Sequence, residues 1–234
     1  IIHCAAIIPG TKNVSDSSIS SKNILIDKHI IDVCRRTGSK LTYISSTSVY
    51  GFPLKEKVTE SRVGKDLSLY AQGKLAAEKE IMRSQLDARI LRLNAPYGYR
   101  QSTRTVLKIF IERALVNEDL KYFGSGKRMQ DFTFVGDVAE FIVDSIDVSA
   151  GGIFNVSANE PISMKELAEL VITLVPGCKS RVQRINQRDS QEEHTALYDT
   201  TCARQKLGWN PTTDLKSGIK NWINSIKNET GHTV

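Results

Sequence analysis

Tyr43-Ile-Ser-Ser-Thr-Ser-Val-Tyr-Gly51 ends an apolar strand in a serine-rich run, and Ser68-Leu-Tyr-Ala-Gln-Gly-Lys-Leu-Ala-Ala-Glu78 follows it along the chain. The second stretch contains a Tyr-x-x-x-Lys pair, Tyr70 and Lys74. If residues 68–83 are helical, the two positions share one face, and the Lys74 ammonium can lie beneath the Tyr70 phenol. A nearby positive charge favours the phenolate, so we expect the pKa of Tyr70 to fall from about 10 toward neutrality. Tyr70 would then be a usable general acid/base.

Ser46 and Thr47 lie at the carboxyl end of the preceding strand. Either hydroxyl would donate a hydrogen bond to the substrate oxygen on which Tyr70 acts. The hydroxyls at the strand end and the Tyr70–Lys74 pair on the helix therefore together predict a reaction centre.

Short apolar runs alternate with helical patterns in the first half of the chain, which is typical of an α/β fold with a doubly wound parallel sheet. The expected strands are 1–2, 41–44 and 88–93, and the expected helices are 23–36 and 68–84. Ligands of such sheets bind beyond the carboxyl ends of the strands, where the serine run lies. The serine-rich stretch 13–21 is expected to be a long loop at the same edge.

After Asn94 the pattern indicates a smaller α/β unit. Helices are expected at 105–116, at 137–146, from Ser163 with Glu166 in a capping-box pattern, and from Asp214. Strands are expected at 120–123, 132–135, 153–156 and 182–185, with residues 124–127 as a turn between two strands.

The composition is that of an ordinary globular chain, with 234 residues of which 40% are hydrophobic and 25% charged. The net charge of +6 is spread over segments in which basic and acidic residues alternate, so it does not predict a nucleic-acid interface. The four cysteines and four histidines are dispersed, which argues against a disulfide framework or a metal site. Because no apolar run reaches the roughly 18 residues of a membrane span, a cytoplasmic protein with no membrane partner is the default expectation.

Several segments occur in the order and at the spacing of one family. They are Ile1-Ile-His-Cys-Ala-Ala6, the helix opening at Asn23, the serine run through Gly51, the Tyr70–Lys74 pair, Arg92-Leu-Asn-Ala-Pro-Tyr-Gly98, Asp131-Phe-Thr-Phe-Val-Gly-Asp137 and Leu207-Gly-Trp-Asn-Pro211. Over nearly its whole length the chain resembles the extended short-chain dehydrogenase/reductases, specifically the NAD-dependent epimerase/dehydratase branch that acts on nucleotide-activated sugars. The resemblance implies a Rossmann-like NAD(P)-binding domain of residues 1–93 and 131–147. The remaining residues, 94–130 and 148–234, would form the substrate-binding domain.

The resemblance also implies roles for single residues. Ser46, Tyr70 and Lys74 would form the catalytic centre, in which Tyr70 removes a proton from a sugar hydroxyl and the cofactor accepts hydride. The NAD or NADP site would comprise Ala5, Ala6, Asn23, Ser45, Tyr70, Lys74 and Pro96. The candidates for contact with the nucleotide-sugar are Thr47, Ala95, Arg100, Arg104 and Arg128. Whether the protein forms a homodimer stays open.

Three positions depart from the pattern of that branch. Ser48 stands where dehydratases and decarboxylases carry an acidic residue, so an epimerase or ketoreductase is favoured; Asp16 or Glu60 would have to supply the missing acid. Ala95 replaces an asparagine. Gln130 replaces an arginine that would grip the diphosphate, which is why the three arginines above are considered as substitutes.

The opening strand and Gly-x-x-Gly-x-x-Gly turn of the family have no counterpart in this sequence. We therefore expect an N-terminally truncated chain that is inactive by itself. The alternative is a non-catalytic remnant or a sugar-binding module without the cofactor loop. The residue that distinguishes NAD from NADP would belong to the missing part, so that choice stays open.

Overall fold

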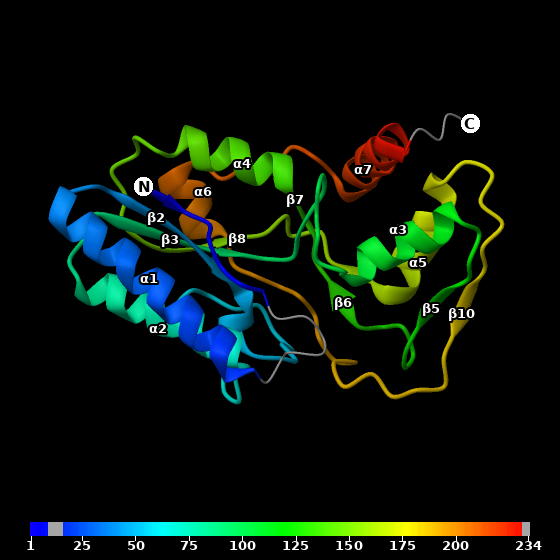
Figure 1. The fold of residues 1–234 in the computed structure, drawn as a ribbon. Helices are drawn as coiled ribbons and strands as arrows, with labels where there is room; N and C mark the ends of the chain where they lie inside the picture. Colours follow the sequence, from blue (N-terminus) through cyan, green and yellow to red (C-terminus); the bar gives the residue numbers. More distant parts are fainter. Residues whose placement is uncertain (9–15, 231–234) are drawn as a thin grey trace.

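The computed structural model describes residues 1–8 and 16–230, and its larger part is a parallel sheet with helices on both faces (Figure 1). The strand order is β1-β2-β3-β8. The strands are β1 (Ile2–His3), β2 (Leu41–Ser46), β3 (Ala88–Leu93) and β8 (Gly152–Val156). Helices α1 (Ser17–Thr37) and α2 (Leu69–Arg83) cover one face, and α4 (Val135–Asp144) and α6 (Thr201–Leu207) cover the other. The predicted Rossmann-like fold class is confirmed.

The central strand β3 shows how the sequence builds these two layers. Ile90 packs with Ile81 of α2, whereas its neighbour Leu91 packs with Phe141 of α4 on the opposite face. Successive side chains of a strand point to opposite faces, so a strand covered on both sides has to be apolar throughout. Ile90 and Leu91 are both 0% exposed.

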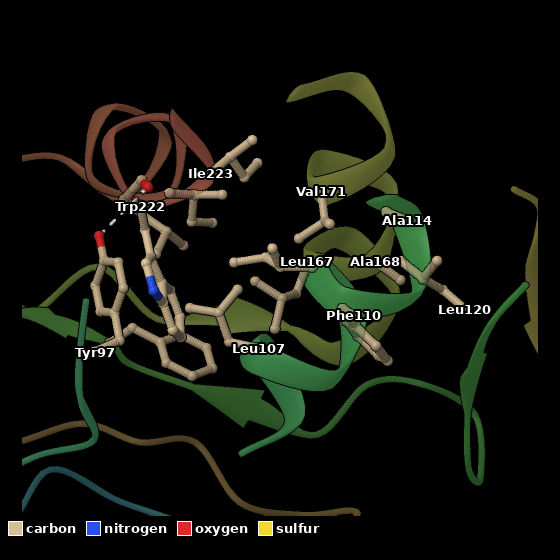
Figure 2. Packing of buried hydrophobic residues seen from close by; sticks show 14 of the residues in the cluster. Tyr97, Leu107, Phe110, Ala114, Leu120, Leu167, Ala168, Val171, Trp222 and Ile223 are labelled. Carbon is tan, nitrogen blue, oxygen red and sulfur yellow. Dashed lines mark hydrogen bonds between the residues drawn. The ribbon is translucent and has the colours of Figure 1, made fainter. Parts of the chain in front are cut away.

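The smaller part packs around three helices, α3 (Val106–Leu115), α5 (Met164–Leu174) and α7 (Leu215–Thr230). Figure 2 shows Leu107 and Phe110 of α3, Leu167 of α5 and Trp222 of α7 meeting in its core. Short strands pair around these helices: β4 (Pro96–Tyr97) with β7 (Thr133–Phe134), β5 (Leu120–Tyr122) with β10 (Val182–Arg184), and β6 (Met129–Gln130) with β9 (Ile162–Ser163). The capping box predicted for α5 is confirmed, because Ser163 and Glu166 each accept a hydrogen bond from the backbone N–H of the other.

Strand β8 belongs to the main sheet, which differs from the domain division predicted from the sequence. It pairs with β3 from Arg89↔Gly152 to Leu93↔Val156, although residues 148–234 were assigned to the smaller domain. Trp209, which follows α6, also packs in the core on the main sheet. Strand partners depend on which elements meet in space, and the order of the segments along the chain does not specify that.

Helix α1 also begins earlier than predicted. Asp16 caps it by accepting a hydrogen bond from the backbone N–H of Ser18 at 2.8 Å, so residues 17–21 of the expected loop are helical. Residues 13–15 of that loop lie outside the described residues. Five short elements were not predicted: α6, the 3₁₀ turn η1 (Thr47–Tyr50) and the strands β4, β6 and β9. Within the described part of the chain, no helix has the length and apolar character needed to cross a membrane.

Candidate active site

The turn η1 directly follows β2 and places Ser46 at the carboxyl edge of the main sheet. Ser46 has extended backbone angles, and its Oγ accepts a hydrogen bond from the backbone N–H of Ser48 at 3.2 Å. A hydroxyl that accepts one bond keeps its own O–H for a second partner. The partly exposed Ser46 side chain can therefore still donate to a ligand.

Tyr70 and Lys74 lie four residues apart on α2, which begins at the N-cap Ser68. Both line one small cavity of about 10 Å³, together with Ser20, Asn23, Asp27, Leu69 and Gly73. The spacing argument for this pair thus agrees with the structure, which also places Asn23 of α1 beside it.

Lys74 is only 6% exposed. Its ammonium donates a hydrogen bond to the carbonyl oxygen of Ile44 at 2.8 Å and lies 4.6 Å from the ring centre of Tyr43. A cation over an aromatic face is stabilised by the electrons of the ring. Strand β2 therefore holds the Lys74 ammonium through one backbone carbonyl and one aromatic ring.

The expected lowering of the Tyr70 pKa is wrong for this structure. Burial raises the pKa of Tyr70, and the negative charge of Asp27 raises it further. Burial lowers the pKa of Lys74, although Asp27, Glu78 and Cys4 act in the opposite direction. Burial is thus the main reason and the Asp27 charge the second, while the Lys74 ammonium is directed at Ile44 and Tyr43.

The candidate cofactor residues on β1 and α1 surround the end of the first strand. Ala5 is exposed and Ala6 is half-buried in the segment after β1. The Asn23 side-chain amide accepts from the backbone N–H of Ile7 at 2.8 Å and donates to its carbonyl at 2.9 Å. Asn23 therefore fixes the course of the chain beyond Ala6, and Pro96 is exposed in β4.

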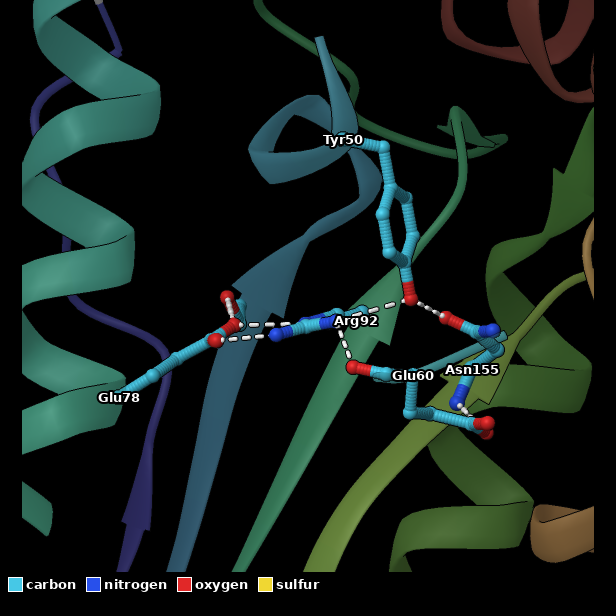
Figure 3. Close-up of polar contacts among 6 residues, drawn as sticks. Tyr50, Glu60, Glu78, Arg92 and Asn155 are labelled. Carbon is cyan, nitrogen blue, oxygen red and sulfur yellow. Dashed lines mark hydrogen bonds and ion pairs between the residues drawn. The ribbon is translucent and has the colours of Figure 1, made fainter. Parts of the chain in front are cut away.

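Ser45 has a different role from the one that the sequence suggested. Its hydroxyl is buried and donates to the carboxylate of Glu78 at 2.5 Å, so it does not face a cofactor. Figure 3 shows the network to which it belongs, in which Arg92 binds both Glu78 and the hydroxyl of Tyr50. Tyr50 in turn donates to Asn155 of β8 at 2.5 Å, so the network ties α2 to η1 and the sheet.

A second polar network lies at the ends of β2 and β3. Thr47 is 3% exposed and donates to the side-chain oxygen of Asn94 at 3.1 Å. The Asn94 amide donates to the backbone carbonyl of Asp131 at 2.8 Å and to its carboxylate at 3.2 Å. Thr47 thus supports this edge of the sheet, and Ala95, which follows Asn94, packs against the core of the smaller part.

A larger pocket of about 390 Å³ lies in the smaller part. Its apolar lining is Val106, Ile109, Phe110, Tyr122, Phe123, Met164 and Ile185, and its charged lining is Arg113, Lys121, Arg128 and Asp189. The Arg128 guanidinium is held by Gln191 at 3.1 Å and by Asp189 at 3.3 Å. The pocket therefore offers an apolar wall beside an excess of positive charge.

The other candidate arginines lie elsewhere. Arg104 has a 70% exposed side chain and pairs with Glu112 at 3.4 Å. Arg100 lines an open hollow against α7 that shares no lining residue with the two pockets described above. Only Arg128 among the three arginines therefore lines the charged pocket.

The sequence did not predict Asp27 beside Tyr70, or Arg113 and Lys121 in the pocket. Asp27 lies on the face of α1 that its periodicity buries, four residues after Asn23, and a carboxylate at such a position was the available signal. Arg113 and Lys121 belong to charge patterns that look like ordinary solvated surfaces. No local signal in the sequence distinguishes Arg113 and Lys121 from such surface residues.

Comparisons with known proteins show the family and the fold. The sequence profile of the NAD dependent epimerase/dehydratase family matches residues 1–157. A putative UDP-glucose 4-epimerase of Methanocaldococcus jannaschii is 29% identical over 97% of this chain and 77% of its own length. UDP-glucuronic acid decarboxylase 4 of Arabidopsis thaliana is 30% identical over 84% of this chain, which spans about half (46%) of that protein. The crystal structure of UDP-glucose 4-epimerase from Thermotoga maritima with UDP-glucose superposes with a TM-score of 0.88 at 22% identity, covering 98% of this chain and 77% of that one.

Proposed function

Because the chain belongs to the NAD dependent epimerase/dehydratase family, we propose that its function is that of an NAD(P)-dependent nucleotide-sugar epimerase or ketoreductase. The observation that carries this proposal is the shared cavity of Tyr70, Lys74 and Asn23 next to the carboxyl end of β2. A half-buried tyrosine and a buried lysine that line one cavity are rarely there for packing alone, because burial of their polar ends is costly. Ser46 completes the proposed reaction centre.

The residues at this edge fit the nicotinamide-ribose end of the cofactor. An ammonium has three N–H donors, and the Lys74 ammonium uses one of them on Ile44, so the ribose hydroxyls would suit the others. The small side chains of Ala5 and Ala6 leave room for a close approach of the cofactor to the end of β1. When bound, NAD(P) would supply the hydride acceptor for the sugar carbon.

The residues of the chain would move the proton. Tyr70 would take it from the sugar hydroxyl, and Ser46 would orient that oxygen with its remaining O–H. Because burial raises the pKa of Tyr70, its phenol holds a proton at neutral pH in the structure described here. The Lys74 ammonium, which shares the cavity, is the group that would favour the phenolate during the reaction.

The pocket beside Arg128 would hold the nucleotide. Its aromatic and aliphatic wall suits a base, and Arg113, Lys121 and Arg128 suit a diphosphate. Arg128 is three residues from Asp131, whose side chain and backbone bind Asn94 at the end of β3. Three residues span at most about 11 Å, so a nucleotide-sugar is long enough to join this pocket to the sheet edge.

Epimerisation or keto reduction is favoured over loss of water. Ser48 cannot replace a carboxylate near neutral pH, and the two alternative acids are engaged elsewhere. Asp16 caps α1, and the Glu60 carboxylate accepts the backbone N–H of Asn155 at 2.9 Å. Asp27 does line the cavity, but both of its oxygens accept hydrogen bonds from the sheet side, from His3 and Tyr43.

The test is to incubate the full-length protein with NAD(P)⁺ or NAD(P)H and a panel of nucleotide-sugars. An unchanged product mass supports epimerisation, and a gain of two hydrogens supports ketoreduction. A product lighter by one water or by carbon dioxide would contradict the proposal. Binding of nucleotide-sugars without turnover across the panel would favour the sugar-binding module instead. A homodimer and a cytoplasmic location stay predictions.

A further inference from the structure

Asp27 is a buried carboxylate that the proposed reaction does not use. It is 5% exposed on α1, and its two oxygens have separate partners. Oδ1 lies 2.8 Å from Nε2 of His3 on β1, and Oδ2 accepts from the hydroxyl of Tyr43 on β2 at 3.2 Å. A carboxylate can only accept hydrogen bonds, so His3 carries its proton on Nε2. These two contacts fix the orientation of the Asp27 carboxylate.

The same contacts bring the Asp27 charge next to the proposed reaction centre. Tyr43 donates to Asp27 while its ring lies beneath the Lys74 ammonium, 4.6 Å from Nζ. Asp27 also lines the cavity that Tyr70 and Lys74 share. One negative group therefore faces both members of the pair.

Other ionisable groups near Lys74 are less able to balance its charge. Glu78, on its own helix, already binds Arg92 through both oxygens, so its charge is compensated. Cys4, after β1, has a thiol pKa raised by burial and is therefore neutral near pH 7. Tyr43 and Tyr70 also hold their protons, because burial raises the pKa of each. His3 can donate from Nε2 to Asp27 without carrying a charge.

We infer that Asp27 is a positioning residue for the Tyr70–Lys74 pair, whose buried charge keeps Lys74 an ammonium, an inference that rests on the reaction centre proposed above. Burial alone would drive Lys74 toward the neutral amine, which could not stabilise a phenolate. The same negative charge of Asp27 also opposes the ionisation of Tyr70. Asp27 thus raises the pKa of both groups and sets the pH range in which a protonated Lys74 and an ionisable Tyr70 coexist.

The direct test uses NMR on the 234-residue chain, without cofactor. The ¹⁵Nζ shift of Lys74 and the ¹³Cζ shift of Tyr70 are followed against pH and assigned with Lys74→Arg and Tyr70→Phe. In Asp27→Asn both apparent pKa values should fall, each by about one unit, the usual effect of one nearby charge. The matched control is Asp32→Asn on the exposed face of the same helix, where Asp32 pairs with Arg35, and it should shift neither value.

Unchanged titrations in a folded Asp27→Asn chain would overturn the inference. Asp27→Ser, which is also neutral and can still accept from Tyr43, gives the same test if the amide variant does not fold.

In the full-length protein, Asp27→Asn should shift both limbs of the kcat/KM pH profile to lower pH by about one unit, whereas a purely structural role would lower activity at all pH values alike. If no nucleotide-sugar is turned over, the proposed function fails while the NMR result stands. If turnover is found and the pH limbs do not move, the inference about Asp27 fails by itself.

Discussion

Arg92 and Glu78 form a doubly hydrogen-bonded ion pair inside the protein, with Nε to Oε1 at 3.0 Å and Nη2 to Oε2 at 2.6 Å, and both side chains are 2% exposed. Planar matching of this kind is the strongest form of carboxylate–guanidinium contact. Glu78 lies one helical turn after Lys74 on α2 and also accepts from Ser45 on β2. The pair therefore anchors α2 to the sheet at the level of the proposed reaction centre (Figure 3).

Glu78→Gln should lower the free energy of unfolding by about 3–5 kcal/mol, because it leaves the Arg92 charge buried without an opposite charge. The matched control is Glu80→Gln, which removes the exposed pair with Arg35 and should cost less than about 1 kcal/mol. Urea unfolding followed by circular dichroism measures both values. Equal losses of unfolding free energy in the two variants would show that the buried pair stabilises the fold no more than the exposed pair does.

Tyr70→Phe in the full-length protein should reduce turnover by about 10² or more, because it removes the ionisable oxygen and keeps the ring. The free energy of unfolding should change little. Tyr99→Phe is the control, since Tyr99 is 47% exposed and does not line the Tyr70 cavity. Near-normal turnover of the Tyr70 variant would mean that the tyrosine is structural.

Arg128→Ala should weaken binding of UDP to the chain by about tenfold or more, since a charge-assisted hydrogen bond contributes about 1.5–3 kcal/mol. The loss is expected to be large because Asp189, which pairs with Arg128, would then face the phosphates without compensation. Arg104→Ala removes an equal charge from the surface and should have little effect. Calorimetric titration distinguishes the two, and equal affinities would place the diphosphate outside this pocket.

His194 should make the protein less stable in mild acid. It is 1% exposed, its Nδ1 accepts from the backbone N–H of Leu54 at 3.0 Å, and burial, aided by Arg128, lowers its pKa from 6.5 to about 4. The folded state holds the neutral ring, so the stabilisation is complete above pH 6.5 and is lost as the pH falls toward 4, by about 2–3 kcal/mol in total.

His194→Asn tests this linkage, because its side-chain oxygen can replace Nδ1 as the acceptor and does not titrate. The fall in unfolding free energy between pH 6.5 and 4 should become shallower in this variant. The exposed His29→Asn should keep the wild-type slope. A wild-type slope in the His194 variant would assign the acid sensitivity to other groups.

Patterns within single elements were sufficient to predict much of the fold. Apolar runs at 41–44 and 88–93 gave two strands of the main sheet, and the helical spacing of Tyr70 and Lys74 gave their common cavity. These predictions hold because periodicity along a helix or strand is a local property of the backbone. The first turn of α1 was missed, since its serine-rich sequence resembles a loop and Asp16 supplies the cap that starts the helix.

By itself, the sequence determined which chemical groups stand at the end of β2 and on one face of α2, because spacing along an element is enough for that. Only the tertiary structure decided where those groups point. In the folded chain Lys74 points toward Ile44 and Tyr43, the Ser45 hydroxyl donates a hydrogen bond to Glu78, and Asp27 reaches the cavity from another helix. Contacts of this kind join residues that are far apart in the sequence. Tyr43 and Asp27 are 16 positions apart, and Thr47 and Asn94 are 47 positions apart. Their formation depends on how helices dock on the sheet and on the need of each buried polar group for a partner, and neither is a property of one segment.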